Sequence, residues 1–199
     1  MAPLSINPTS SAVLSMDLQN GIISVYAKDD PKLPVRAAGV IKRSREAGAK
    51  VIHVKVGFRP GLPEICSRNQ LFHSIKGSSR HQKLFEGDMG AIHQAVAPES
   101  GEVVVTKSRV NAFAGTDLEL VLRAAQIDTL VLFGIATSGV VLSTLLHASD
   151  ADYRLFVVKD CCVDADSSVH SCLIEKFFPS RATVLTSDET IAALHKGEG

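Results

Sequence analysis

Tryptophan is absent from this chain of 199 residues, aromatic residues make up 5%, and cysteine occurs only four times. No two cysteines have the CxxC spacing that is typical of zinc and redox motifs, and the adjacent Cys161 and Cys162 are poorly placed to bridge each other. A disulfide framework is therefore not expected in a chain of this size. We expect Cys66, Cys161, Cys162 and Cys172 to be reduced, with the adjacent pair behaving as small apolar residues at a strand end.

An excess of charge of one sign is also missing. Lys and Arg together number 21, as do Asp and Glu, so the formal net charge is zero. Neither half of the chain carries a basic stripe, and nucleic acid and anionic membranes are therefore not expected partners. No apolar run approaches the roughly 20 residues of a transmembrane helix, and the first residues lack the features of a secretory signal. We expect a cytoplasmic protein, although secretion without a leader leaves no mark in a sequence.

The 45% of residues that are hydrophobic follow a regular alternation. Short apolar runs rich in Val, Ile and Leu predict buried strands, and segments with a 3.6-residue period predict helices. The predicted strands cover residues 11–16, 51–56, 102–106, 130–134, 154–159 and 182–185. The predicted helices cover residues 35–47, 117–125, 140–151, 167–178 and 187–194. This alternation predicts an α/β fold, a three-layer Rossmann-like sandwich whose six-stranded parallel sheet has helices on both faces.

Local signals refine this pattern. The helix over residues 35–47 is predicted to turn five residues inward, namely Val35, Ala38, Val40, Ile41 and Ser44. Gly48 is predicted to end this helix, and Thr116 and Ser187 are predicted helix caps. Residues 57–101 contain several turn dipeptides and one short predicted helix, residues 88–96, and this long connection is expected to shape a pocket.

In folds of this kind, ligands bind beyond the carboxyl ends of the strands. Asp17 follows the first predicted strand and Lys107 follows the third, so we expect them to form a proton-transfer pair in which each shifts the pKa of the other. Taken singly, each has a simpler interpretation, because Asp often caps a turn and Lys is usually solvated. The fourth predicted strand runs through the small residues 136–139 into a helix N-terminus, where a ligand can approach closely.

Four segments carry a family resemblance: MDLQNG (16–21), TKSRVNAFAGT (106–116), GIATSGVVLST (134–144) and DYRLFVVKDCCVD (152–164). They resemble the isochorismatase-like hydrolases over roughly residues 11–194. The resemblance implies a parallel six-stranded sheet flanked by helices, a small-molecule substrate and a homo-oligomer. The length of the chain and its lack of repeats and linkers predict a single domain over residues 1–199. It also implies catalytic roles, because Asp17 matches the family's Asp and Lys107 matches its Lys.

The chain departs from the family pattern at a third position. The cysteine of the pattern G-[IV]-x-T-x-x-C falls on Val140, and valine cannot form the acyl-enzyme of nicotinamidase- and carbamoylase-like relatives. Metal-binding relatives carry D-x-H with a further His, a spacing that His53, His73, His81 and His93 do not form. We therefore expect no metal and no cofactor, and we interpret His53 as a core or pocket-wall residue.

Without the thiol, the resemblance implies acid-assisted hydrolysis, as in the cleavage of a vinyl ether by isochorismatase itself. A buried Asp17 would protonate the substrate, water would attack, and Lys107 would orient the substrate and stabilise negative charge. The candidate substrate-binding residues are Gln19, Phe58, Arg59, Asn111, Phe113, Thr137, Ser138, Gly139 and Val140. Among them, Arg59 suits a substrate carboxylate, and the backbone N–H groups of residues 138–140 suit a carboxylate or a carbonyl.

Simpler interpretations stay open for several of these candidates. Arg59 is also explained as a solvated surface residue, Phe58 and Phe113 as ordinary packing, and Gln19 and Asn111 as turn residues. Two other functions stay open as well: an amidase-fold enzyme with altered chemistry and substrate, and a non-catalytic member that binds a small molecule or another protein. The presence of both Asp17 and Lys107 favours an enzyme.

Overall fold

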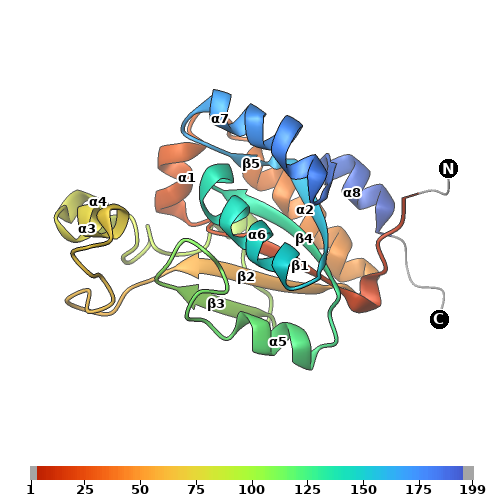
Figure 1. The fold of residues 1–199 in the computed structure, drawn as a ribbon, viewed down its shortest axis with the longest axis horizontal. Coiled ribbons are helices and arrows are strands. Elements are labelled where there is room, and N and C mark those ends of the chain that lie inside the picture. The colour runs from red at the N-terminus through yellow and green to blue at the C-terminus, as the bar shows by residue number, and fades with distance from the viewer. Residues whose placement is uncertain (1–3, 195–199) are drawn as a thin grey trace.

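The computed structural model describes residues 4–194 and contains a six-stranded sheet (Figure 1). Every pairing is parallel, in the order β3-β2-β1-β4-β5-β6. The strands are β1 (Ser11–Met16), β2 (Lys50–Val56), β3 (Val103–Lys107), β4 (Thr129–Ile135), β5 (Arg154–Val163) and β6 (Thr183–Leu185). The predicted α/β fold with six parallel strands is therefore confirmed.

The helices are α1 (Asn20–Tyr26), α2 (Leu33–Ala47), α3 (Gln70–Lys76), α4 (Ser79–Lys83), α5 (Leu118–Ala124), α6 (Leu142–Asp150), α7 (Ser167–Cys172) and α8 (Ser187–Ala193). Helices α2 and α8 pack together against one face of the sheet. The connections through α5 and α6 cross the sheet in the direction opposite to the connection through α2, so the right-handed rule places them on the other face. Helices α3 and α4 project at the left of Figure 1. Within residues 4–194, no helix has the length and apolar character needed to cross a membrane.

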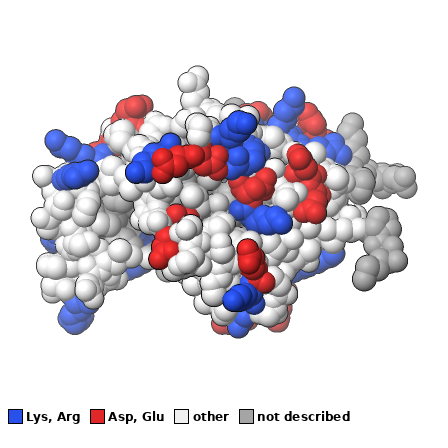
Figure 2. Space-filling model, turned by 90° about the horizontal axis from the view of Figure 1, so that it is seen from above, with Lys and Arg blue, Asp and Glu red and all other residues white. Residues whose placement is uncertain are grey.

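Burial along the strands explains this layering. Every residue of β1 and β4 is buried, as expected for central parallel strands that are covered on both faces. The edge strand β3 leaves Val104 and Thr106 exposed, so one face of this edge is open. Figure 2 shows positive and negative side chains interspersed on the face seen from above, so no patch of a single sign covers that face.

The long connection between β2 and β3 folds differently from the prediction. Residues 88–96 do not form a helix beyond a 3₁₀ turn at Gln94–Val96. Instead the connection forms α3 and α4, which begin where the side chains of Asn69 and Ser78 accept hydrogen bonds from backbone N–H groups of the first turn. These short helices, and α1 after the first strand, lack the apolar period on which the sequence prediction relied.

Helix α2 buries Val40, Ile41 and Ser44, as predicted. It begins at Leu33, so Leu33 and Ala37 also face the core, and the prediction is wrong at Val35, which is 67% exposed. Gly48 ends the helix at a φ of 87°, as predicted, because glycine adopts this left-handed conformation without a Cβ clash. Helix α5 begins at Leu118, and the hydroxyl of Thr116 accepts the Leu118 N–H at 3.3 Å.

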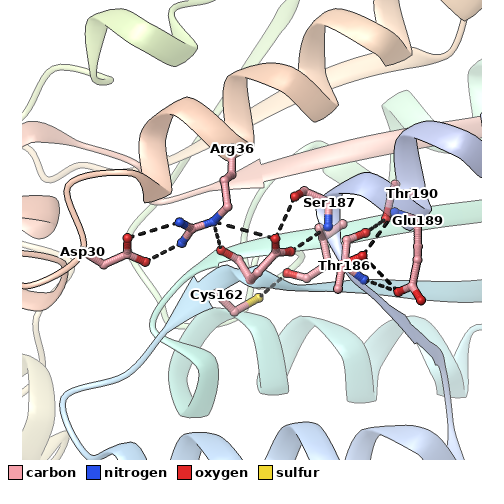
Figure 3. Close-up of polar contacts among 9 residues, drawn as sticks. Asp30, Arg36, Cys162, Thr186, Ser187, Glu189 and Thr190 are labelled. Atoms are coloured by element: carbon pink, nitrogen blue, oxygen red, sulfur yellow. Dashed lines mark hydrogen bonds and ion pairs between the residues drawn. The ribbon is translucent and has the colours of Figure 1, made fainter.

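Strand β5 is longer than predicted, and its extension organises the start of α8. A register shift beside Gly134 lets the strand continue past Asp160 and pair again with β4. Thr186, not Ser187, caps α8, through a reciprocal capping box with Glu189 (Figure 3). Ser187 instead donates its N–H and its hydroxyl to the Asp160 carboxylate, each at 2.7 Å.

Arg36 of α2 completes this polar network from the other side. Its Nε donates to the Asp160 carbonyl at 2.7 Å, and its guanidinium pairs with Asp30 (Figure 3). The network therefore ties α2, β5 and α8 together. The carboxylates of Asp30 and Asp160 are both bonded to groups of the protein itself, so we interpret this network as structural.

Gly134 allows β1 and β4 to approach each other closely near the carboxyl edge of the sheet. It has a φ of 144°, and a Cβ added there would lie 2.0 Å from the Met16 carbonyl oxygen. We expect Gly134→Ala to lower the free energy of unfolding by about 3 kcal/mol or more, because the backbone must shift. The measurement is urea unfolding of the variant and the wild-type protein.

Gly39→Ala is the matched control. Gly39 lies inside α2, and the nearest heavy atom to an added Cβ is Ile191 Cδ1, at 3.7 Å. We expect this variant to be more stable than wild type by about 0.5–1 kcal/mol, because alanine favours a helix interior. Equal urea midpoints for the two variants would contradict the close approach at Gly134.

Candidate active site at the carboxyl edge of the sheet

A carboxyl group and an amine meet in the interior at the carboxyl edge of the sheet. Asp17 follows β1 and Lys107 ends β3, with β2 between these strands. Lys107 Nζ lies 2.8 Å from Asp17 Oδ2, and the two side chains are 1% and 5% exposed respectively. Nζ also donates to the Arg109 carbonyl at 3.0 Å. The fold thus brings together the acid and the amine that the sequence places at separate strand ends.

The Asp17 carboxyl is held in an unusual environment. Its backbone φ of 58° lies in the left-handed region, which Asp tolerates better than most residues. Its second oxygen, Oδ1, is buried and has no hydrogen-bond partner within residues 4–194. Burial raises the pKa of this carboxyl above its usual 3.8, while the charge and hydrogen bond of Lys107 act in the opposite direction. A raised pKa favours the protonated form that a general acid requires.

The turn after β4 is bonded to the segment that follows β5. The Ile135–Ala136 peptide is cis, and Thr137–Val141 forms a π-helical turn that leads into α6, so helix begins before the predicted residue 140. Thr137 Oγ1 lies 2.8 Å from His170 Nδ1 on α7. The Ser138 N–H donates to Asp164 Oδ2 at 2.7 Å. These contacts hold the turn against α7.

Two of the three N–H groups expected to face a substrate are already bonded within the protein. Besides Ser138, Gly139 donates its N–H to the Ala136 carbonyl at 3.1 Å. Val140 is 2% exposed and belongs to the hydrophobic core. A Cβ on Gly139 would lie 3.8 Å from Val110 Cγ1, so the segment after β3 packs against the turn. The N–H groups of Ser138 and Gly139 are therefore not free for a substrate, contrary to the sequence prediction, although Ser138 itself is exposed.

Three of the other predicted residues make contacts within the scaffold. The side-chain oxygen of the fully buried Gln19 accepts the Val56 N–H at 2.7 Å. Its side-chain nitrogen donates to the carbonyls of Val56 and Gly90, at 3.0 and 2.9 Å. Asn111 Oδ1 accepts the Phe113 N–H at 2.8 Å. The Phe113 ring stacks on His147, with ring centroids 4.3 Å apart. In this structure these side chains position backbone and core elements around the buried pair.

Phe58 and Arg59 lie together at a different place. Both line a cavity of about 870 Å³ beside the ends of β2 and β3, to which Asp17 and Lys107 do not contribute. Arg59 is exposed, and its Nη1 lies 2.7 Å from Glu64 Oε1. The charge expected to bind a substrate carboxylate is thus balanced by a carboxylate of the chain.

The sequence reasoning missed Asp164 and His170 as partners of the turn. Both follow β5, at the edge where the other candidates lie, and Asp164 stands in a motif that was already singled out. Their position after a predicted strand could have marked them as candidates. The sequence could not show that they bond the turn after β4, because these contacts depend on the path of α7 over the end of that strand.

Cys161, Cys162 and His53 are buried, whereas Cys66 is half-buried and Cys172 is exposed. Burial raises the pKa of the Cys162 thiol to about 12 and that of Cys161 above its usual range, so neither is a thiolate near neutral pH. His53 Nε2 lies 3.1 Å from Glu102 Oε2. In the described part of the chain, no three His, Cys, Asp or Glu side chains gather as metal ligands do.

A parallel α/β sheet with a buried acid–lysine pair at its carboxyl edge defines the class of the protein as an α/β enzyme fold with its site in the usual place. The Isochorismatase domain model matches residues 11–189. The chain therefore belongs to the isochorismatase family of hydrolases.

Individual relatives agree with this assignment. The maleamate amidohydrolase of Pseudomonas putida is 28% identical over 188 residues, which cover 92% of this chain and 86% of the relative. The isochorismatase family protein YecD of Escherichia coli O157:H7 is 30% identical, with coverage of 96% and 100%. The structure of an isochorismatase family protein from Burkholderia thailandensis superimposes with a TM-score of 0.81 at 27% identity, covering 96% of this chain and 97% of that one.

The buried pair predicts a distinctive dependence of stability on pH. Lys107→Met removes the positive charge that opposes the raised pKa of Asp17. We expect the variant to lose about 3–5 kcal/mol of stability at pH 7, because a carboxyl group buried without its partner must either stay charged or take up a proton to become neutral. The native Asp17 then binds a proton that the unfolded chain has released. The deficit is therefore small near pH 4 and grows as the pH rises, until it levels off above the folded-state pKa.

Urea unfolding between pH 4 and pH 8 measures this deficit. The double variant Asp17→Asn/Lys107→Met is the control, because it removes the titrating group together with its partner. We expect it to recover much of the stability at pH 7 and to lose the added pH dependence. A deficit in Lys107→Met that stays constant with pH contradicts this electrostatic description.

Proposed function

We propose that this isochorismatase-family hydrolase cleaves a small carboxylated substrate by acid-assisted attack of water, without a cysteine nucleophile. The observation that carries the proposal is the buried contact of 2.8 Å between Asp17 and Lys107, with Asp17 Oδ1 left without a partner among the described residues. Val140 stands where the family pattern has cysteine, and the buried thiols of Cys161 and Cys162 have raised pKa values. These features support acid catalysis rather than thiolate attack.

On a vinyl ether such as isochorismate, Asp17 gives its proton to the terminal enol carbon. The carbon that bears the ether oxygen becomes an oxocarbenium ion, and water adds to it while the Asp17 carboxylate takes up a proton from that water. Collapse of the resulting hemiketal breaks the C–O bond and releases an alcohol and pyruvate. Lys107 orients the substrate and stabilises negative charge during these steps.

A substrate reaches the buried pair only if part of its covering moves. The Arg109 carbonyl bonds the Lys107 ammonium, and Val110 packs beside Gly139. Both belong to the segment that follows β3. We therefore assign the opening of the site to a displacement of residues 108–111, a motion of the kind that controls access in many enzymes.

Amide hydrolysis with altered chemistry is the second candidate. The observation that favours it is the similarity to a protein named maleamate amidohydrolase. Maleamate carries both a carboxylate and an amide, so it has the carboxylated character proposed for the substrate. With Val140 at the family's cysteine position, water rather than a thiolate would have to attack the amide.

Release of pyruvate from isochorismate tests the first candidate. We expect turnover by the wild-type protein and a loss of at least about 100-fold in Asp17→Asn and in Lys107→Met, since general acid catalysis contributes about 10²–10⁴-fold. Lys42→Gln is a matched control, because Lys42 is 78% exposed on α2. Absence of release by the wild-type protein, or equal rates in Asp17→Asn and wild type, rules out this mechanism.

Val140→Cys tests the second candidate on a panel of amides that includes maleamate. If the site has the shape of an amidase site, the new thiol is expected to introduce or raise ammonia release, which is measured against wild type and Val140→Ala. No ammonia from any of the three proteins speaks against an amidase-shaped site. If isochorismate also fails, while a small carboxylate raises the melting temperature, the result favours a non-catalytic binding protein.

A further inference from the structure

The cavity beside β2 and β3 has a charge composition that the buried pair does not explain. It is lined by three positively charged residues, Lys55, Arg59 and Arg109, and by one acidic residue, Glu64. Arg59 and Glu64 pair with each other at 2.7 Å. Two positive charges are therefore left in the wall of a cavity of about 870 Å³, a volume that suits a small molecule.

Lys55 and Arg109 have no carboxylate oxygen within 4 Å among residues 4–194. The Arg109 guanidinium is nevertheless oriented in this structure, because it donates to the backbone carbonyls of Ser108 and Glu64, the latter at 2.9 Å. It also lies over the Phe72 ring, 5.6 Å from the centroid. A guanidinium that is already oriented loses little conformational freedom when it binds a carboxylate or a phosphate.

The strand register separates this cavity from the side chain of Lys107. Lys55 and Thr106 are partners in the β2–β3 ladder, and both line the cavity. Because neighbouring residues of a strand point to opposite faces, Lys107 projects away from the face that Thr106 occupies. Arg109 links the two places, since its guanidinium lines the cavity while its carbonyl accepts a hydrogen bond from Lys107.

We propose that this cavity is a binding site for a small anion, an organic carboxylate or a phosphate, held between Lys55 and Arg109. Phe58 and Phe85 form one wall, with ring centroids 5.6 Å apart in an edge-to-face arrangement. A ligand with a flat apolar part beside its charge fits this lining. The site does not depend on the chemistry proposed for Asp17.

Isothermal titration of the full-length protein with benzoate and with inorganic phosphate tests the proposal, and benzyl alcohol serves as the uncharged counterpart of benzoate. We expect saturable binding of at least one anion and none of benzyl alcohol. The anion that binds more tightly distinguishes a carboxylate site from a phosphate site. Lys55→Gln and Arg109→Gln should each weaken binding by about tenfold or more, because each removes a charge-assisted contact.

Arg68→Gln is the matched control, because Arg68 lines a neighbouring cavity with Arg109 and not this one. It should leave the affinity unchanged. Asp17→Asn should also bind like wild type, so a failure of catalysis at the buried pair is distinguishable from a failure here. Absence of saturable anion binding to the wild-type protein overturns the proposal. An unchanged affinity in Lys55→Gln overturns it as well, whether or not Arg109→Gln folds.

Discussion

The buried contact between Asp17 and Lys107 is the interaction on which the rest of the site depends. Taking two charges out of water costs several kcal/mol for each, which is repaid only when the geometry is good and the remaining polar atoms are bonded. Lys107 meets this condition through Asp17 and the Arg109 carbonyl. Asp17 meets it only in part, because Oδ1 has no partner in the described chain. That oxygen is the one atom of the pair that has an unused hydrogen-bonding position in the described chain.

The order of the strands brings this pair together. With β3, β2 and β1 adjacent, the carboxyl ends of β1 and β3 lie one strand apart, and a long lysine side chain spans that distance. On the other side of β1, Gly134 allows β4 to run close enough for its turn to reach the same edge. The contacts of Asp164 and His170 then hold this turn against α7. The site is thus built from four strand ends that the sheet fixes rigidly.

Much of this arrangement could be predicted from the sequence, because apolar strands of a parallel sheet are almost continuous and their ends carry the polar residues. The six strands, the end of α2 at Gly48 and the positions of Asp17 and Lys107 at strand ends were accessible in this way. The inward-facing residues Val40, Ile41 and Ser44 of α2 were accessible too, but the exposure of Val35 was not, because it depends on where the first turn begins.

What the remaining candidates contact depends on tertiary structure. Gln19 and Arg59 are polar residues at strand ends, just as Asp17 is, yet Gln19 bonds backbone groups and Arg59 pairs with Glu64. The long connection after β2 was unpredictable for the same reason, since α3 and α4 are short and are defined by their caps. The positive charge of the β2–β3 cavity combines residues far apart in sequence, so only the fold reveals it.

The most direct measurement of the central claim is the titration of the Asp17 carboxyl itself. Carbon-13 NMR of protein labelled at its aspartate carboxyl carbons, with the resonance assigned by its absence in Asp17→Asn, gives the pKa of this group in the folded protein. If burial holds Asp17 as an acid beside Lys107, the midpoint lies above 3.8. A midpoint at or below 3.8 contradicts the account, because Asp17 would then be an ordinary carboxylate counter-ion of Lys107.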